Sequence, residues 1–211
     1  MEPVRRRTRV KICGVTTPAD ARLAAEAGAD AIGINFHPDS PRSVGPLMAA
    51  EIAAVLPPFV AAVGIFVDPD GDRVRRILSR VRLDYLQFHG DEPAEFCRAF
   101  GVRYVKTARM ADGFDFDAFA EGYPDASAFL LDTYDEHVAG GTGRSFDWST
   151  WPPSDRPLML AGGLHPDNVA AAVKATGPYA VDVASGVEGD VVGRKDAERV
   201  ARFIAEVAGV Q

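Results

Sequence analysis

The residues best suited to chemistry stand at the ends of short β-rich segments of this sequence. In chain order these ends carry Lys11, Cys13, Asn35, Asp68, Gln87, His89, Lys106, Asp132, Asp182 and Ser185. Each of them, taken singly, is compatible with a structural polar group. In parallel α/β proteins, however, ligands bind at the carboxyl ends of the strands, so the shared position of these residues predicts one common site.

Cys13 is the candidate for a base or a nucleophile. It closes the segment 9–13 and precedes Gly14, and Lys11, two residues earlier, falls on the same face of the predicted strand. A nearby ammonium group lowers the pKa of a thiol, which predicts a reactive thiolate here. The alternative is that Cys13 is a small buried hydrophobic residue. Cys97 lies inside a helical segment and is interpreted as structural.

Asp132 is the candidate for a general acid. Three apolar residues at 129–131 precede it and would hold its carboxyl group at the rim of a dry core. The alternative is a carboxylate that caps the following turn. The next loop has three glycines within residues 140–143, Gly141 among them, so it could let backbone approach a ligand or simply be flexible.

Two later turns predict a phosphate site. The turn at residues 161–164 contains Gly163 and follows the seventh β-rich segment, and the turn at 184–188 contains Ser185 and Gly186 and follows the eighth. In (β/α)8 barrels the loops after strands seven and eight recurrently bind phosphate through backbone N–H groups and a helix N-terminus. The alternative is a pair of ordinary tight turns.

Arg42 and His89 have less specific surroundings. Arg42 lies in a loop with two prolines after the second segment, and its guanidinium suits a bidentate grip on a carboxylate, although a solvated surface arginine is the common case. His89 could be an acid, a ligand or a positioning group, whereas a lone histidine is more often structural.

Strand-like and helix-like segments alternate along the whole chain, which predicts parallel strands joined by crossover helices. The β-rich segments span residues 9–13, 31–35, 61–67, 83–88, 103–107, 128–132, 157–161 and 179–183, and helical spacing covers 18–27, 47–56, 72–81, 93–100, 166–175 and 196–207. Glycines and prolines after residues 107 and 148 predict short or irregular helices there. We therefore expect an α/β protein, either an open doubly wound sheet or a (β/α)8 TIM barrel. We also expect a single domain over residues 1–211 with a basic N-terminal extension at 1–8.

The composition and the absence of certain motifs limit the kinds of ligand and partner that we expect. The chain has 211 residues and a formal net charge of −7, which argues against nucleic acid as a partner, and its 47% hydrophobic content allows a sizeable core. Only two cysteines occur, and no signal peptide or spanning segment is apparent, so we expect a soluble cytoplasmic protein without membrane association. The four histidines, at 37, 89, 137 and 165, lack metal-ligand spacing, and no dinucleotide or Walker motif occurs. We expect no metal and no cofactor.

Taken together, the motifs closely resemble phosphoribosylanthranilate isomerase, a (β/α)8 enzyme of tryptophan biosynthesis. The resemblance runs from about residue 9 to the C-terminal helical segment, and its most specific parts are the segments around Cys13 and Ser185. It rests on residues 11–16, 41–43, 66–69, 87–91, 131–132, 140–143, 146–148, 162–164 and 181–188. Ala184 departs from the family pattern, in which serine is usual.

The resemblance implies an Amadori rearrangement of N-(5'-phosphoribosyl)anthranilate without a cofactor. It implies Cys13 as general base, Asp132 as general acid and Arg42 as partner of the anthranilate carboxylate. Gly163, Ser185 and Gly186 would bind phosphate, and Gly141, His89 and Asp182 would lie close to the substrate. The alternatives are another phosphosugar aldose-ketose isomerase on the same barrel, and a non-catalytic sensor of phosphorylated ligands. The assembly would be a monomer or a homodimer.

Overall fold

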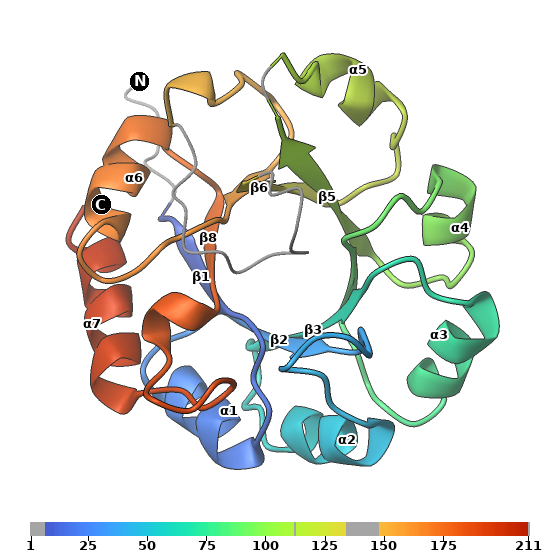
Figure 1. Ribbon diagram of the computed structural model, residues 1–211, viewed down its shortest axis with the longest axis horizontal. Helices are drawn as coiled ribbons and strands as arrows, with labels where there is room; N and C mark the ends of the chain where they lie inside the picture. Colours follow the sequence, from blue (N-terminus) through green and yellow to red (C-terminus); the bar gives the residue numbers. More distant parts are fainter. Residues whose placement is uncertain (1–6, 112, 134–147, 211) are drawn as a thin grey trace.

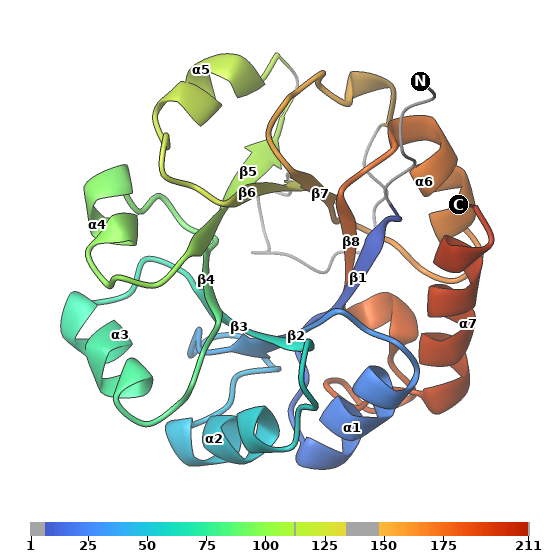
Figure 2. The same cartoon turned by 180° about the vertical axis from the view of Figure 1, so that it is seen from behind.

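The fold is a closed barrel of eight parallel strands surrounded by helices, seen down the barrel axis in Figure 1 and from behind in Figure 2. The structure is a computed structural model that describes residues 7–111, 113–133 and 148–210. The strands follow one another in chain order around the barrel, and the pairing of β1 (Arg9–Ile12) with β8 (Ala180–Val183) closes it. Of the two predicted architectures, the (β/α)8 barrel is confirmed.

All eight predicted strands are present. The other six are β2 (Ala31–Asn35), β3 (Ala61–Phe66), β4 (Tyr85–Phe88), β5 (Tyr104–Met110), β6 (Ala128–Thr133) and β7 (Leu158–Leu160). The largest difference is in β5, which continues three residues beyond the predicted end at 107, paired with β6 as far as Thr133.

The helices occupy the predicted positions. They are α1 (Pro18–Glu26), α2 (Pro46–Ala54), α3 (Gly71–Leu78), α4 (Ala94–Arg98), α5 (Phe116–Glu121), α6 (Val169–Thr176) and α7 (Ala197–Ala208). Of these, α1, α3, α5 and α7 begin at a residue whose side chain caps the helix. Thr17 caps α1 and Asp196 caps α7, each accepting a hydrogen bond from an amide of the first turn. The predicted irregular stretches hold the six-residue α5 and the 3-10 turn η1 (Trp148–Thr150).

Each strand presents alternate residues to two different environments. One set packs under the helices in a large outer cluster that includes Ile12, Phe88, Phe129 and Val181. The other set fills the barrel interior, where Val105, Ala128, Leu130, Met159, Ala161 and Ala180 form a separate cluster. Because the side-chain period of a strand is two, Asp132 and Asp182 share the interior face of Leu130 and Ala180.

Among the described helices, none has the length and apolar character needed to span a bilayer.

Candidate active site

Cys13 lies directly beyond β1 at the carboxyl-end rim of the barrel. Its amide donates to the Val183 carbonyl, which continues the β1–β8 ladder for one residue and fixes the backbone that carries the thiol. Gly33 of β2 packs against it so closely that a Cβ there would lie 2.9 Å from Cys13 Sγ. The thiol is thus held between the first two strands at the predicted position.

The ammonium group beside Cys13 is neutralised by a carboxylate. Lys11 Nζ donates to Asp182 Oδ1 at 2.8 Å, and the two side chains are 2% and 10% exposed. Burial is the largest single influence and would lower the pKa of Lys11, but the charges and hydrogen bonds of Asp182 and Cys13 together raise it. The cation predicted from the two-residue spacing is therefore present, but as half of a buried ion pair.

The pKa of the Cys13 thiol is consequently raised, whereas the sequence predicted that it would be lowered. Burial raises the pKa of Cys13, and the Asp182 carboxylate raises it further, while the ammonium groups of Lys11 and Lys195 oppose the rise. The predicted lowering was wrong because desolvation disfavours the thiolate and Asp182 cancels much of the nearby positive charge. The resting thiol is protonated at neutral pH.

Asp132 stands at the end of β6 against His89. His89 Nε2 lies 3.3 Å from Asp132 Oδ2, and their side chains are 13% and 11% exposed. On the other side of the imidazole, Nδ1 lies 3.1 Å from Gln87 Nε2 and 3.2 Å from Thr107 Oγ1. With the Gln87 amide donating to Nδ1, a neutral imidazole carries its proton on Nε2 and directs it to the carboxylate.

Cys13 and Asp132 occupy the same end of the barrel on its interior side. Cys13 continues the interior face of Lys11, which pairs with Asp182 inside the barrel, and Asp132 continues the interior face of Leu130. Going around the barrel from β6 to β1, the intervening strands are β7 and β8. A thiol and a carboxyl group thus approach the mouth from two separated parts of its wall.

Arg42 is paired inside the protein and is not a solvated surface arginine. Its Nε and Nη2 atoms donate to the two carboxylate oxygens of Glu188 at 2.7 and 2.8 Å, and its side chain is 16% exposed. Glu188 Oε1 also accepts from Lys195 Nζ at 3.0 Å. Burial alone would raise the pKa of Glu188, but hydrogen bonds from Arg42 and the charge of Lys195 lower it.

Sequence reasoning missed Lys195 as a site residue. It belongs to the segment between β8 and α7, where no periodic pattern marks it, and burial lowers its pKa. Its Nζ also donates to the carbonyl of Ala184 at 2.9 Å. Residues 189–194 reverse the chain, so that Lys195 pairs antiparallel with Glu188. A short turn between a glutamate and a lysine is the signal in the sequence that could have identified Lys195.

The two glycine turns predicted to bind phosphate lie against each other. Gly186 belongs to the 3-10 turn η2 (Ser185–Val187), and a Cβ on it would lie 1.9 Å from the Leu164 carbonyl oxygen of the other turn. Gly163 has φ +62°, and its carbonyl accepts from Asn168 Nδ2 at 2.9 Å, which ties the turn to the start of α6. Within the described chain no hydrogen bond uses the amides of Gly163 and Leu164.

Two residues predicted from the sequence remain to be placed. Gly141 lies outside the described residues. Lys106 does not face the mouth, because it shares the outer face of β5 with Tyr104 and forms a buried ion pair with Glu92, 2.8 Å from Nζ to Oε2. Glu92 also accepts from the amides of Asp68 and Gly90, so this pair fixes the loops after β3 and β4. In the described part of the chain no group of three or more potential ligands could hold a metal ion.

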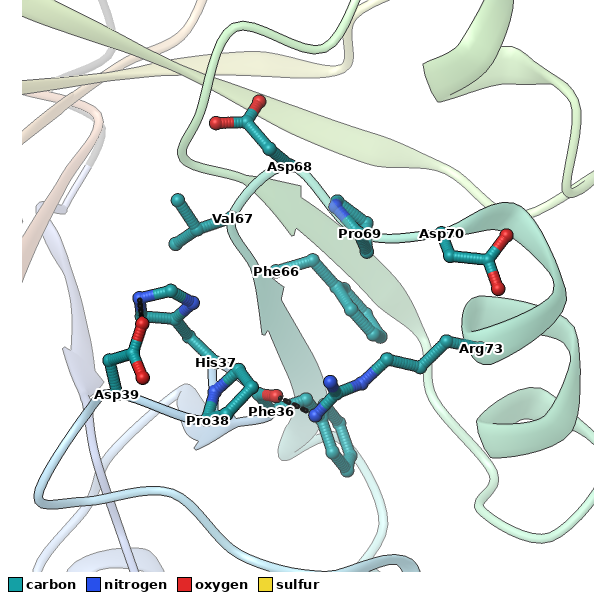
Figure 3. Close-up of a pocket in the computed structure, with 10 residues that line it drawn as sticks. All are labelled: Phe36, His37, Pro38, Asp39, Phe66, Val67, Asp68, Pro69, Asp70 and Arg73. Atoms are coloured by element: carbon teal, nitrogen blue, oxygen red, sulfur yellow. Dashed lines mark hydrogen bonds and ion pairs between the residues drawn. The ribbon is translucent and has the colours of Figure 1, made fainter.

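A separate pocket of about 260 Å³ lies beside the mouth, between the loops after β2 and β3 (Figure 3). Phe36 and Phe66 stack in its wall with ring centroids 5.2 Å apart, and Arg73 crosses it to donate to the Phe36 carbonyl at 2.7 Å. The sequence did not predict it. Of the residues predicted to share one site at the strand ends, Asp68 lines this pocket, whereas Cys13 and Asp132 do not, so the pocket is distinct from their region.

A closed α/β barrel with ionisable groups at its carboxyl-end rim and adjoining amide-rich turns after β7 and β8 defines a class of barrel enzymes that act on phosphorylated substrates. Residues 10–206 match the family of N-(5'phosphoribosyl)anthranilate (PRA) isomerase. The chain belongs to this family, as its motifs predict, and the predicted isomerase class is confirmed.

Individual relatives agree with this assignment. The N-(5'-phosphoribosyl)anthranilate isomerase of Nitrosococcus oceani is 49% identical over 205 residues, covering 97% of this chain and 99% of the relative. The crystal structure of phosphoribosyl anthranilate isomerase from Thermotoga maritima has a TM-score of 0.87 at 39% identity, covering 96% and 99%. Another structure of such an isomerase, in complex with reduced 1-(o-carboxyphenylamino)-1-deoxyribulose 5-phosphate, has a TM-score of 0.84 at 38% identity, covering 96% and 99%.

Proposed function

We propose that this chain converts N-(5'-phosphoribosyl)anthranilate into 1-(2-carboxyphenylamino)-1-deoxyribulose 5-phosphate, with Cys13 as general base and Asp132 as general acid. The observation that carries the proposal is the placement of these two groups on the interior side of one barrel rim, in a chain of the matching family. The reaction is a step of tryptophan biosynthesis.

The acid acts first. Asp132 in its protonated form donates to the ribose ring oxygen, the bond from that oxygen to C1 breaks, and the substrate nitrogen supplies the electron pair that forms a protonated Schiff base. The imidazole of His89 lies 3.3 Å from the Asp132 carboxylate and orients it toward the barrel mouth. As the proton leaves, the Nε2–H group of His89 stabilises the negative charge that develops on Asp132.

The base acts second. The Cys13 thiolate removes the proton from C2, and the electrons flow to the iminium nitrogen to form an enolamine, which tautomerises to the ketone. A thiol with a raised pKa is ionised in a small fraction of molecules, but each thiolate is a stronger base. Gly33 restricts the position of the sulfur, which limits the geometries from which it can approach C2.

Binding groups surround the reacting sugar. The turns that contain Gly163 and Gly186 offer backbone amides to the phosphate, and Ser185 adds a hydroxyl group at the start of η2. Arg42 holds the anthranilate carboxylate. Asp182 acts on Cys13 through Lys11.

The remaining properties follow from this chemistry. The substrate's own nitrogen serves as the electron sink, so the reaction proceeds without a cofactor. The enzyme works in the cytoplasm on a small phosphosugar, as a monomer or a homodimer, with no nucleic acid or membrane as partner.

The test is to replace each catalytic group while following the fluorescence of phosphoribosylanthranilate without added metal or nucleotide. Cys13→Ser and Asp132→Asn each lower turnover at least about a hundredfold, the usual scale for a positioned acid or base, and change substrate affinity only a few-fold. Cys97→Ala is the matched control, since Cys97 is buried in α4. Unchanged turnover in either variant would show that the assignment is wrong.

A second assay addresses substrate identity. An aldose-ketose isomerase of histidine biosynthesis would act on a different phosphosugar, and a non-catalytic sensor would bind ligands without turning them over. We expect turnover of phosphoribosylanthranilate by the wild-type chain, and its absence at micromolar enzyme would favour one of these alternatives.

A further inference from the structure

Three charged side chains meet beside Cys13 and form what we call the Arg42 cluster: Arg42, Glu188 and Lys195. Their side chains are 16%, 5% and 0% exposed. The carboxylate of Glu188 joins the other two, with 2.7 and 2.8 Å contacts to the guanidinium and 3.0 Å to the ammonium group. Charges this deeply buried lose their hydration, and their mutual attraction offsets that cost only in part, so the cluster is weak evidence for a role in stability.

The guanidinium of Arg42 presents two edges that can each hold a carboxylate. Glu188 occupies the edge made by Nε and Nη2. Among the described residues no hydrogen bond uses Nη1, so the edge made by Nη1 and Nη2 is open to a second carboxylate. The stem of Arg42 rests on Gly14, where a Cβ would lie 2.5 Å from Arg42 Cδ, which places the side chain next to the thiol residue.

Charge decides whether that open edge attracts an anion. Arg42 and Glu188 alone form a neutral pair, which offers an incoming carboxylate hydrogen bonds but no net positive charge. With Lys195 added, the cluster carries one net positive charge. Because the cluster is shielded from water, that charge acts at a lower effective dielectric constant than a surface charge would.

We propose that Lys195 is a positioning residue that makes the Arg42 cluster selective for a substrate carboxylate. Glu188 fixes the orientation of the guanidinium, and Lys195 offsets the charge of Glu188 so that the open edge of Arg42 remains attractive to an anion. The inference rests on the proposed function, because the anion in question is the carboxylate of the anthranilate group.

Lys195 also supports the phosphate turn, and the test has to separate the two roles. Its Nζ donates to the Ala184 carbonyl, directly before Ser185, so its loss weakens binding of any phosphorylated ligand. The probes are therefore reduced 1-(o-carboxyphenylamino)-1-deoxyribulose 5-phosphate, the ligand of a related isomerase, and its aniline counterpart, which lacks only the carboxylate. The ratio of their Kd values, measured by calorimetry, isolates the carboxylate.

Lys195→Met is expected to reduce the preference for the carboxylate ligand at least about tenfold, the scale of one lost charge at short range. The double variant Lys195→Met with Glu188→Gln restores a net charge of plus one and is expected to recover most of that preference. Lys174→Met, an exposed lysine on α6, is the matched control and keeps the wild-type ratio. If Lys195→Met alone does not fold, the double variant carries the test.

The outcomes separate this inference from the proposed function. An equal loss of affinity for both ligands in Lys195→Met, or a further loss of preference in the double variant, would overturn the charge role of Lys195. A double variant that folds but binds the two ligands with equal Kd would overturn it as well. The proposed function is contradicted by a different result, namely a wild-type chain that does not turn over phosphoribosylanthranilate.

Discussion

Gly186→Ala tests whether the turns after β7 and β8 bind the substrate phosphate together. The new Cβ would lie 1.9 Å from the Leu164 carbonyl oxygen, 2.9 Å from its carbonyl carbon and 3.0 Å from His165 Cα. All three contacts are with backbone, which has no flexible side chain to move aside. To reach an ordinary contact near 3.4 Å, the two turns have to separate by about 1.5 Å.

A separation of this size has two measurable consequences. Overpacking of this kind lowers the free energy of unfolding by about 1–3 kcal/mol. Misplacing binding groups by about 1 Å costs up to about a hundredfold in catalytic efficiency. We expect kcat/KM to fall about 30- to 100-fold, mainly through KM, because the turns bind the phosphate and do not touch the reacting carbons.

The assay combines steady-state kinetics, competitive inhibition by inorganic phosphate and urea unfolding. Gly189→Ala is the control on the same segment, since the nearest atom to its Cβ would be Asp196 Cβ at 4.0 Å. It should retain wild-type kinetics. A folded Gly186→Ala enzyme with unchanged KM and unchanged inhibition by phosphate would refute the joint phosphate site.

Two further predictions concern the thiol. Gly33→Ala places a Cβ 2.9 Å from Cys13 Sγ, so we expect kcat to fall about tenfold or more while KM stays within a few-fold, as steady-state kinetics would reveal. Since burial raises the pKa of Cys13 above its ordinary value of 9.0, alkylation by iodoacetamide and the base-dependent limb of kcat/KM should both keep rising with pH beyond 9. Cys97, whose pKa burial raises to about 12, should stay unmodified in the folded protein by mass spectrometry. Cys13 ionising below 9, or equal labelling of both cysteines, would contradict this account.

Local patterns in the sequence, together with the family resemblance of its motifs, were sufficient to predict the barrel and the strand ends at which Cys13 and Asp132 lie. Alternation of β-rich and helical segments predicts parallel strands, because a crossover helix returns the chain so that the next strand runs in the same direction as the last. The family resemblance then selects the barrel over the open sheet. The two-residue spacing of Lys11 and Cys13 also predicts correctly that they share a face. Such properties depend on residues a few positions apart, whose geometry the backbone sets.

The electrostatics of the site depended on partners that the sequence does not bring near. Asp182, which reverses the expected effect of Lys11 on the thiol, is 171 residues away from that lysine. Glu188, which removes Arg42 from solvent, is 146 residues away from it. Lys106 faces Glu92 under the loops because the register of β5 assigns it to the outer face.

The sequence by itself determined the family, the order of the strands and which strand ends carry the thiol and the carboxyl group. Only the tertiary structure decided which charges neutralise one another and how far each ionisable group is buried from solvent. The physical reason is that a strand's period is local, whereas desolvation and Coulomb energy depend on distances between residues that only the closure of the barrel brings together.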